Sequence, residues 1–203
     1  MLLAFDTSTA ACTAALFDEE GTCLGSRNEL IGRGHAERLV PMISELLDGR
    51  RADRILVGVG PGSFTGIRVA IAAAHGLAIG WEAELDGMSS LALLAAGANG
   101  DGEIGVALTG GHGELFVQQF DAATGVPTMT VASRSPITAA ALVTAQLVIG
   151  SGARQLVDAR GSGEARDAWP SAADALKIPQ QLRTLAPKPL YGRAPDARVP
   201  EAA

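Results

Sequence analysis

One segment of this 203-residue sequence, residues 57–68, reads VGVGPGSFTGIR. Its four glycines free the backbone for a tight turn between an apolar strand and an apolar helix, and Ser63 or Thr65 can cap that helix. Backbone amides at a helix start attract phosphate, so the turn is a candidate anion site. It is not a P-loop, because no Lys-Ser or Lys-Thr pair follows the last glycine. Spacing alone leaves a purely structural turn as the other interpretation.

Strands and helices alternate on both sides of this turn. The apolar patterns predict a strand over residues 2–5, a hairpin through residue 27, a helix over 35–47, a strand over 54–58, a helix over 66–80, and strands over 104–108 and 115–120. Hairpin strands followed by alternating helices and strands indicate an α/β fold with a mixed sheet covered by helices.

A polar, glycine-rich stretch at residues 99–102 interrupts this pattern, and we place a domain boundary near residue 100. Residues 1–100 would form an N-terminal subdomain, and residues 101–203 a smaller C-terminal one with a Pro-rich tail. The apolar patterns that indicate helices and strands are weaker in this second half. It predicts a helix over 137–145, a strand over 146–150 and a weak helix over 165–176.

The composition argues against direct binding of nucleic acid. Sixteen Lys and Arg residues against 22 Asp and Glu give a net charge of −6, the wrong sign for a protein that neutralises RNA phosphates, so a partner would have to hold any RNA. Asp6 interrupts the apolar start and no basic residue precedes it, so we expect no signal peptide. The longest apolar stretch, residues 69–79, is too short for a membrane span. These features predict a cytoplasmic protein.

The two cysteines are expected to remain reduced. The predicted hairpin register would pair Cys23 with Leu16 and Cys12 with Arg27. The two sulfurs would then lie about four residues apart along the ladder, roughly 13 Å, which is beyond disulfide reach.

Four segments resemble the TsaB/YeaZ family. The most specific is GPGSFTGIR at residues 60–68, which resembles the family signature; the others are LAFDTST at 3–9, HAERLVP at 35–41 and PLYGRAP at 189–195. The resemblance covers residues 1 to about 120 and the tail. Where the family commonly has an Asp-Ala-Arg run before Gly-Glu, this chain reads TGGHGE at residues 109–114, so any role of that run is open here.

The resemblance implies an actin-like ATPase (ribonuclease-H-like) fold, with two related subdomains whose mixed sheets are flanked by helices and separated by a cleft. In that superfamily the first hairpin approaches nucleotide phosphates, and Asp6 would take the place of a metal-phosphate aspartate. The implied phosphate or nucleotide residues are Asp6, Thr7, Ser8, Gly60, Gly62 and Ser63. The alternative for Asp6 is a strand-end residue that satisfies hairpin amides. Weak ATP or ADP binding is the most that we expect.

The resemblance also implies that the chain does no chemistry alone. The catalytic relative of the family, TsaD, binds its metal through two histidines four residues apart, and the matching places here hold Gly87 and Leu91. His35, His75 and His112 are scattered singly. We therefore expect no catalytic residue, no metal and no required cofactor.

Two apolar helices supply the expected partner surface. The helix over 66–80 is apolar around nearly its whole circumference, so one side would lie on its own sheet and the other on a partner. In the family, as the resemblance implies, this helix and the one over 35–47 pack on the catalytic subunit; an ordinary Ala-rich core helix is the alternative. The residues that we assign to this contact are His35, Leu39, Ile43, Ala70, Ala74 and Leu77.

The resemblance implies a non-catalytic scaffold subunit of the complex that forms N6-threonylcarbamoyladenosine at position 37 of tRNAs reading ANN codons. The expected partners are a TsaD-type catalytic subunit in a heterodimer, a TsaE-type P-loop ATPase and tRNA held through the complex. The sequence leaves open whether the isolated chain is a homodimer or a monomer, and we expect no membrane contact. The rival function is an ATP-dependent small-molecule phosphotransferase of the same superfamily, because Asp6 and the glycine turn could handle ATP. The thin second half weakens that rival.

Overall fold

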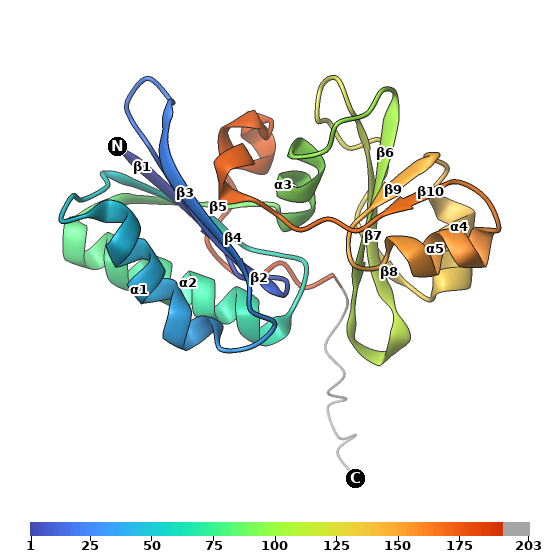
Figure 1. Ribbon diagram of the computed structural model, residues 1–203, viewed down its shortest axis with the longest axis horizontal. Helices are drawn as coiled ribbons and strands as arrows, with labels where there is room; N and C mark the ends of the chain where they lie inside the picture. The colour runs from blue at the N-terminus through green and yellow to red at the C-terminus, as the bar shows by residue number, and fades with distance from the viewer. Residues whose placement is uncertain (193–203) are drawn as a thin grey trace, which may run out of the picture.

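The computed structural model describes residues 1–192, and within them two five-stranded mixed sheets stand side by side (Figure 1). The first sheet has the order β3-β2-β1-β4-β5 and contains β1 (Leu2–Asp6), β2 (Ala11–Phe17), β3 (Cys23–Leu30), β4 (Arg54–Gly58) and β5 (Glu84–Met88). The second has the order β10-β9-β6-β7-β8 and contains β6 (Glu103–Thr109), β7 (Leu115–Asp121), β8 (Ala132–Arg134), β9 (Leu147–Ile149) and β10 (Glu164–Arg166).

The two sheets share one topology. In each, the first three strands form an antiparallel meander, and the last two run parallel to the first strand. This repeated arrangement confirms the predicted actin-like, ribonuclease-H-like fold with two related subdomains.

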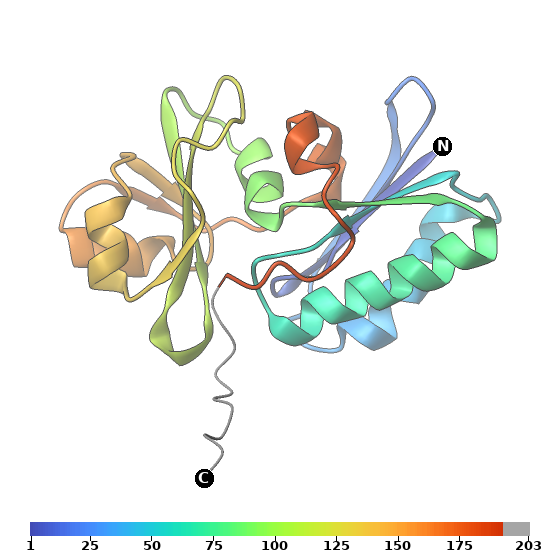
Figure 2. The ribbon, with the colours of Figure 1, turned by 180° about the vertical axis from the view of Figure 1, so that it is seen from behind.

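Helices cover the outer faces of both sheets and fill the space between them (Figures 1 and 2). On the first sheet lie α1 (His35–Leu47) and α2 (Phe64–Trp81); on the second lie α4 (Pro136–Leu142) and α5 (Ala153–Arg160). Between the sheets lie α3 (Ser90–Ala96) and the 3₁₀ helix η2 (Ala172–Lys177), while η1 (Gly111–Gly113) and η3 (Gln180–Leu182) are short turns.

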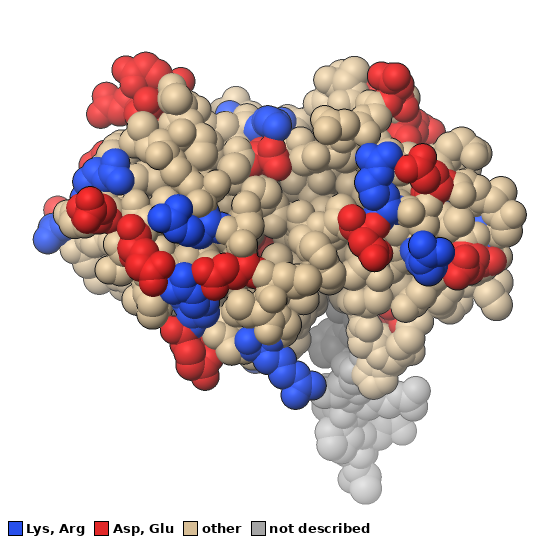
Figure 3. Space-filling model, in the orientation of Figure 1, with Lys and Arg blue, Asp and Glu red and all other residues tan. Residues whose placement is uncertain are grey.

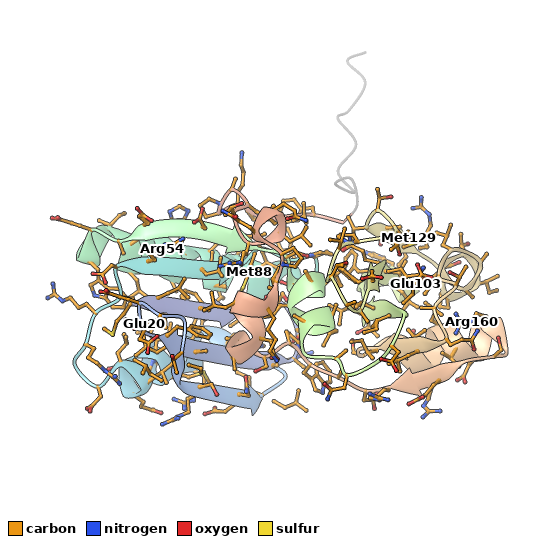
Figure 4. The ribbon with its side chains drawn as sticks, turned by 90° about the horizontal axis from the view of Figure 1, so that it is seen from above. Glu20, Arg54, Met88, Glu103, Met129 and Arg160 are labelled. Atoms are coloured by element: carbon orange, nitrogen blue, oxygen red, sulfur yellow. The ribbon has the colours of Figure 1, made fainter. Side chains whose placement is uncertain are left out.

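The central core joins the two subdomains. Apolar side chains of both sheets pack on α3 and η2 in one cluster, which includes Phe17 of β2, Leu91 of α3 and Phe120 of β7. Met88, at the end of β5, lies at the junction of the two halves (Figure 4). The two subdomains therefore share one hydrophobic core, because these residues are buried only when both sheets are in place.

Local sequence explains the first half well. The strands and helices predicted up to residue 120 are present, and α1 turns the apolar stripe Leu39, Met42, Ile43, Leu46 and Leu47 inward. The start of α2 is capped by Ser63, whose side chain accepts a hydrogen bond from the Gly66 amide at 3.3 Å. Ser63, rather than Thr65, is therefore the cap.

The second half differs from the prediction in several places. The helix near residue 137 and the strand near residue 147 are present, but α5 was not predicted, and residues 165–176 form β10 and η2 rather than a weak helix. The strand β5 and the helix α3 were not predicted either. These elements are short, so each offers too few residues for a clear period.

The end of the described chain returns to the first subdomain. Residues 185–192, which we call the C-terminal strap, begin with two backbone hydrogen bonds between Leu185 and Gly87 of β5 (2.7 and 2.9 Å). Further along, the Leu190 amide donates to the Val59 carbonyl at 2.8 Å. The η2 helix also contacts the first sheet, where the Ala172 amide donates to Thr13 Oγ1 at 2.7 Å. The predicted boundary near residue 100 falls between the strands of the two sheets, and these later segments return across it to pack on the first sheet.

Within the described residues, α2 is the one helix that is long and apolar enough to cross a membrane by length and composition alone. The apolar stretch over residues 69–79, which the prediction judged too short for a span, is the middle of this 18-residue helix. Only 28% of it is buried in the chain, and it lies beside α1 on the first sheet (Figure 2). An apolar helix with an uncovered side has two candidate neighbours, lipid or protein.

The hairpin register differs from the prediction by a bulge. Cys23 pairs with Phe17, one residue from its predicted partner, and Cys12 pairs with Glu29, two residues from its predicted partner, because the register shifts by a further residue between Leu16 and Phe17. Both cysteines are free thiols, Cys12 buried and Cys23 exposed.

Candidate functional site

Asp6 ends β1 as a completely buried carboxylate. One oxygen accepts hydrogen bonds from the backbone amide and the hydroxyl of Ser8, each at 2.7 Å, and the other accepts from the Ser90 hydroxyl at 2.5 Å. Burial raises the pKa of the Asp6 carboxyl, and the hydrogen bonds from Ser90 and Ser8 oppose that rise. Asp6 thus joins the first turn to the start of α3.

The turn after β1 packs directly on the glycine segment. Thr7 Oγ1 donates to the Gly66 carbonyl at 2.7 Å, and the Ser63 amide donates to the Ser8 carbonyl at 2.6 Å. A Cβ added at Gly62 would overlap the Ser8 carbonyl, and one at Gly66 would overlap the Thr7 carbonyl. The glycines are therefore required for a close approach of two backbones.

The predicted phosphate residues are brought together, with Asp6 and Thr7 held inside the fold, whereas Ser8, Gly62 and Ser63 line a cleft. Asp6, Thr7 and Ser8 are buried, and the Gly60 amide donates to Ser90 Oγ at 3.1 Å. A metal-bound nucleotide, which the fold family implies, needs carboxylate and amide groups directed at solvent. At this joint between the β1–β2 turn and the glycine segment both oxygens of Asp6 are engaged, so Asp6 does not fit a metal-bound nucleotide, and the strand-end interpretation of Asp6 is supported. Nucleotide binding elsewhere in the cleft stays a prediction.

A cleft of about 780 Å³ opens beside this joint, between the two subdomains. One wall comes from the β1–β2 turn, the start of α2 and the C-terminal strap, and the other from the β6–β7 turn and its neighbours. The larger and polar side chains that line the cleft include Phe64, Arg68, Glu114, Ser133, Trp169 and Tyr191.

The β6–β7 turn, where the sequence departs from the family pattern, forms part of the second wall. Thr109, Gly110 and Gly111 all line the cleft. The Thr109 amide donates to Ser151 Oγ at 3.1 Å, which ties the turn to the loop before α5. At positions 109–111 the wall thus offers a hydroxyl and backbone, where the family pattern would place a charged pair.

An aromatic and cationic cluster stands at the first wall. The Arg68 guanidinium lies 3.7 Å from the centroid of the Phe64 ring, and its Nε and one Nη donate to the Tyr191 hydroxyl at 3.2 and 3.0 Å. The Phe64 and Tyr191 rings stack with centroids 5.7 Å apart. The sequence pattern showed no sign of this cluster, because the exposure of Phe64 and Tyr191 is known only from the folded chain.

Most of the residues that were predicted to contact a partner face the interior of this chain. Leu39, Ile43, Ala70 and Ala74 are buried against the first sheet, and Leu77 is half-buried there. They belong to the chain's own core because the inward stripe of each helix holds its regular apolar positions. His35 is half-buried at the start of α1, and its Nε2 has no hydrogen-bond partner among the described residues.

The uncovered sides of these helices carry other residues. On α2 they include Ala72, Gly76, Ile79 and Gly80, and Ile79 is 80% exposed. On α1 the side chain of Val40 is 51% exposed. We call these five residues the outer helix face. At the two places that match the TsaD histidines, Gly87 pairs with the C-terminal strap and Leu91 is buried in the central core.

Known proteins resemble this chain in sequence and structure. The family model for TsaD, tRNA N6-adenosine threonylcarbamoyltransferase, matches residues 25–136, which is more than half of the chain. The tRNA threonylcarbamoyladenosine biosynthesis protein TsaB of Escherichia coli is 36% identical over 127 residues, 59% of this chain and 54% of that protein. The chain thus spans about half the length of that relative.

Two solved structures from Pseudomonas aeruginosa match nearly the whole chain. A protein described as similar to peptidase YeaZ is 33% identical, with a TM-score of 0.80 over 95% of this chain and 99% of that one. A second, described as YeaZ, is 30% identical, with a TM-score of 0.76 over 94% and 98% of the two chains. The four sequence segments, the duplicated fold and these matches agree, and the chain belongs to the TsaB/YeaZ family.

Proposed function

We propose that this protein is a non-catalytic subunit in the biosynthesis of threonylcarbamoyladenosine in tRNA. Its relatives named TsaB carry that pathway in their names, and the family model is that of the transferase TsaD. The buried Asp6 supports a role without phosphoryl chemistry, because both of its carboxylate oxygens are engaged within the fold. We propose no required cofactor, and a cytoplasmic location, where tRNA is found.

The observation that carries this proposal is the uncovered apolar side of α2. Ile79 is 80% exposed, and Ala72, Gly76 and Gly80 leave the helix surface nearly flat beside it. Small residues let two helix backbones approach closely, and a flat apolar strip favours a protein helix as its neighbour. We propose that the outer helix face binds a TsaD-type catalytic subunit, which is built on a related fold.

The charge distribution supports an indirect contact with tRNA. The net charge is −6, and on the face shown in Figure 3 acidic and basic side chains alternate over the outer helices, while the middle of the face is mostly uncharged. Phosphate binding requires clustered Lys and Arg. We therefore propose that tRNA and a TsaE-type P-loop ATPase join through the catalytic subunit.

A drop-out assay tests the function. The modification of tRNA would be reconstituted from the purified subunits with and without this chain. We expect no modification by this chain alone and a large loss of rate when it is omitted. A full rate without it would contradict the proposal. ATP-dependent phosphorylation of a small molecule by the isolated chain would favour the phosphotransferase instead.

Substitutions on α2 test the surface. Gly76→Glu places a carboxylate on the outer helix face, where a Cβ would meet no atom within 4 Å, so the isolated chain should melt normally. Binding to the TsaD-type subunit should fall by roughly a hundredfold, because burying an unpaired charge costs several kcal/mol. Ala159→Glu, on the exposed side of α5, is the matched control and should bind normally.

Two further results would separate the alternatives. Ala74→Glu should unfold the isolated chain, since Ala74 is fully buried. If Gly76→Glu abolished a homodimer but left binding to the TsaD-type subunit intact, the outer helix face would be a self-association surface. Partition of the wild-type chain into lipid vesicles, lost in Gly76→Glu, would assign the face to a membrane.

A further inference from the structure

The mouth of the cleft exposes an unusual concentration of large rings. Phe64 is 56% exposed, Tyr191 46% and Trp169 37%, and all three line the cleft together with Arg68. Exposed rings are costly in water, whereas Trp, Tyr and Arg are the residues that dominate binding energy at protein interfaces. The composition of the cleft mouth is thus that of a binding hot spot.

The charges in the cleft limit what can bind there. Besides His112, the charged side chains among the described lining residues are Arg68 and Glu114. Glu114 accepts a hydrogen bond from the Ser133 hydroxyl at 2.6 Å, whereas the Arg68 guanidinium has donors beyond those that reach Tyr191. A nucleotide di- or triphosphate needs several cations or a metal. One arginine amid rings suits a ligand with a single carboxylate and apolar groups.

We infer that the cleft binds a short peptide segment of a protein partner, in which an acidic side chain lies beside aromatic or aliphatic ones. The carboxylate would pair with Arg68, and the apolar side chains would pack between Phe64, Tyr191 and Trp169. The volume of about 780 Å³ accommodates a loop or chain end of a few residues. This site differs from the outer helix face because it adds residues of the second subdomain and of the C-terminal strap, although Arg68 lies one helical turn from Ala72 of that face.

Arg68 also has a structural contact, so the test must separate the two roles. Its hydrogen bonds to Tyr191 help to hold the C-terminal strap, as does the hydrogen bond between His75 Nε2 and the Pro187 carbonyl at 3.3 Å. Tyr191→Phe removes the hydroxyl and keeps the ring and the Arg68 charge. Arg68→Gln removes the charge. A purely structural role predicts the same effect for both substitutions, whereas peptide binding predicts loss for Arg68→Gln alone.

The experiment is a peptide selection on the full chain. A random 12-residue phage library would be selected on the immobilised wild-type protein and counter-selected on the variant Phe64→Ala/Trp169→Ala, whose fold is checked by circular dichroism. Recovered peptides would be synthesised and titrated while the fluorescence of Trp169 is followed in a Trp81→Phe background, which leaves one tryptophan. Mg-ATP, ADP and AMP would be titrated in parallel.

We expect recovered peptides to share an acidic residue next to an apolar one and to change the Trp169 emission saturably. Arg68→Gln should weaken them roughly 10- to 100-fold, the range for a charge-assisted hydrogen bond, while Tyr191→Phe and Gly76→Glu should bind within about threefold of wild type. Failure to enrich peptides over the counter-selection variant would overturn the inference. So would equal losses for Arg68→Gln and Tyr191→Phe, or saturable binding of a nucleotide that displaces the peptides.

Discussion

Asp6 and Gly58 fit together so closely that the carboxylate occupies the space where residue 58 would carry its side chain. A Cβ added at Gly58 would overlap the Asp6 carboxylate. The two residues end the neighbouring central strands β1 and β4, and the carboxylate is held from the other side by Ser8 and Ser90. It therefore cannot move aside without losing hydrogen bonds in the buried interior.

Gly58→Ala should destabilise the protein by about 2 kcal/mol or more, because overpacking a rigid buried site forces the carboxylate from its partners. Urea unfolding followed by circular dichroism would measure this loss. In an Asp6→Ala background the same substitution should cost at least 1 kcal/mol less, since the clash is gone. Equal costs in the two backgrounds would show that the overlap is relieved elsewhere.

The stability contributed by Asp6 should depend on pH in a defined direction. Because burial raises the pKa of Asp6, the native state holds its proton more tightly than the unfolded chain. That contribution is complete below the ordinary carboxyl pKa and is lost as the pH rises through the raised value. The unfolding free energy of wild type relative to Asp6→Asn should thus be higher at about pH 4 than at about pH 8.

Asp121 provides the control for this pH dependence. The hydrogen bonds from the Thr124 hydroxyl and amide lower the pKa of its carboxyl, so its contribution is lost as the pH falls. The same comparison for Asp121→Asn should have the opposite slope. If both variants changed alike with pH, the Asp6 carboxyl would not be the group responsible.

Two glycines of the same helix should respond oppositely to alanine. Gly76 lies on the uncovered side of α2, so Gly76→Ala should stabilise the isolated chain by up to about 1 kcal/mol through helix propensity. Gly66 lies against the Thr7 carbonyl, so Gly66→Ala should destabilise it by about 1–3 kcal/mol. Thermal melting of both variants measures the difference, and stabilisation by Gly66→Ala would disprove the close backbone approach.

The two thiols should differ in reactivity. Burial raises the pKa of the Cys12 thiol to about 11, whereas Cys23 is exposed. Iodoacetamide should modify one cysteine per native chain, identified as Cys23 by peptide mass. Cys12 should react more than about a hundredfold more slowly until the chain is unfolded. Rapid modification of both would indicate that β2 opens readily.

The sequence predicted the fold of the first half because its elements are long and carry clear signals. The apolar stripe of α1 and the glycine segment before α2 both specify local structure within a few residues of themselves. Periodicity shows that α2 is apolar on both sides, but not which side its own sheet occupies. For that reason Ala70 and Ala74 were assigned to the partner surface, although they are core residues.

The cleft could not be predicted because its residues meet only in the folded chain. Phe64 and Tyr191 are 127 positions apart in the numbering, yet their rings stack. Trp169 follows β10, a strand of only three residues that has no recognisable period. Asp6 was predicted as a strand-end residue, and it does end β1. Its hydrogen bond from Ser90 could not be predicted, because it depends on α3, which the sequence pattern did not reveal.

The C-terminal strap has a consequence for how the protein is made. Gly87 of the edge strand β5 finds its backbone partner in Leu185, nearly a hundred residues later. On the ribosome, the first sheet would emerge with this edge unpaired, and it would remain so until most of the second subdomain had been translated. An open edge invites pairing with other nascent chains, so we expect Gly87 to be accessible to such contacts until Leu185 has been made.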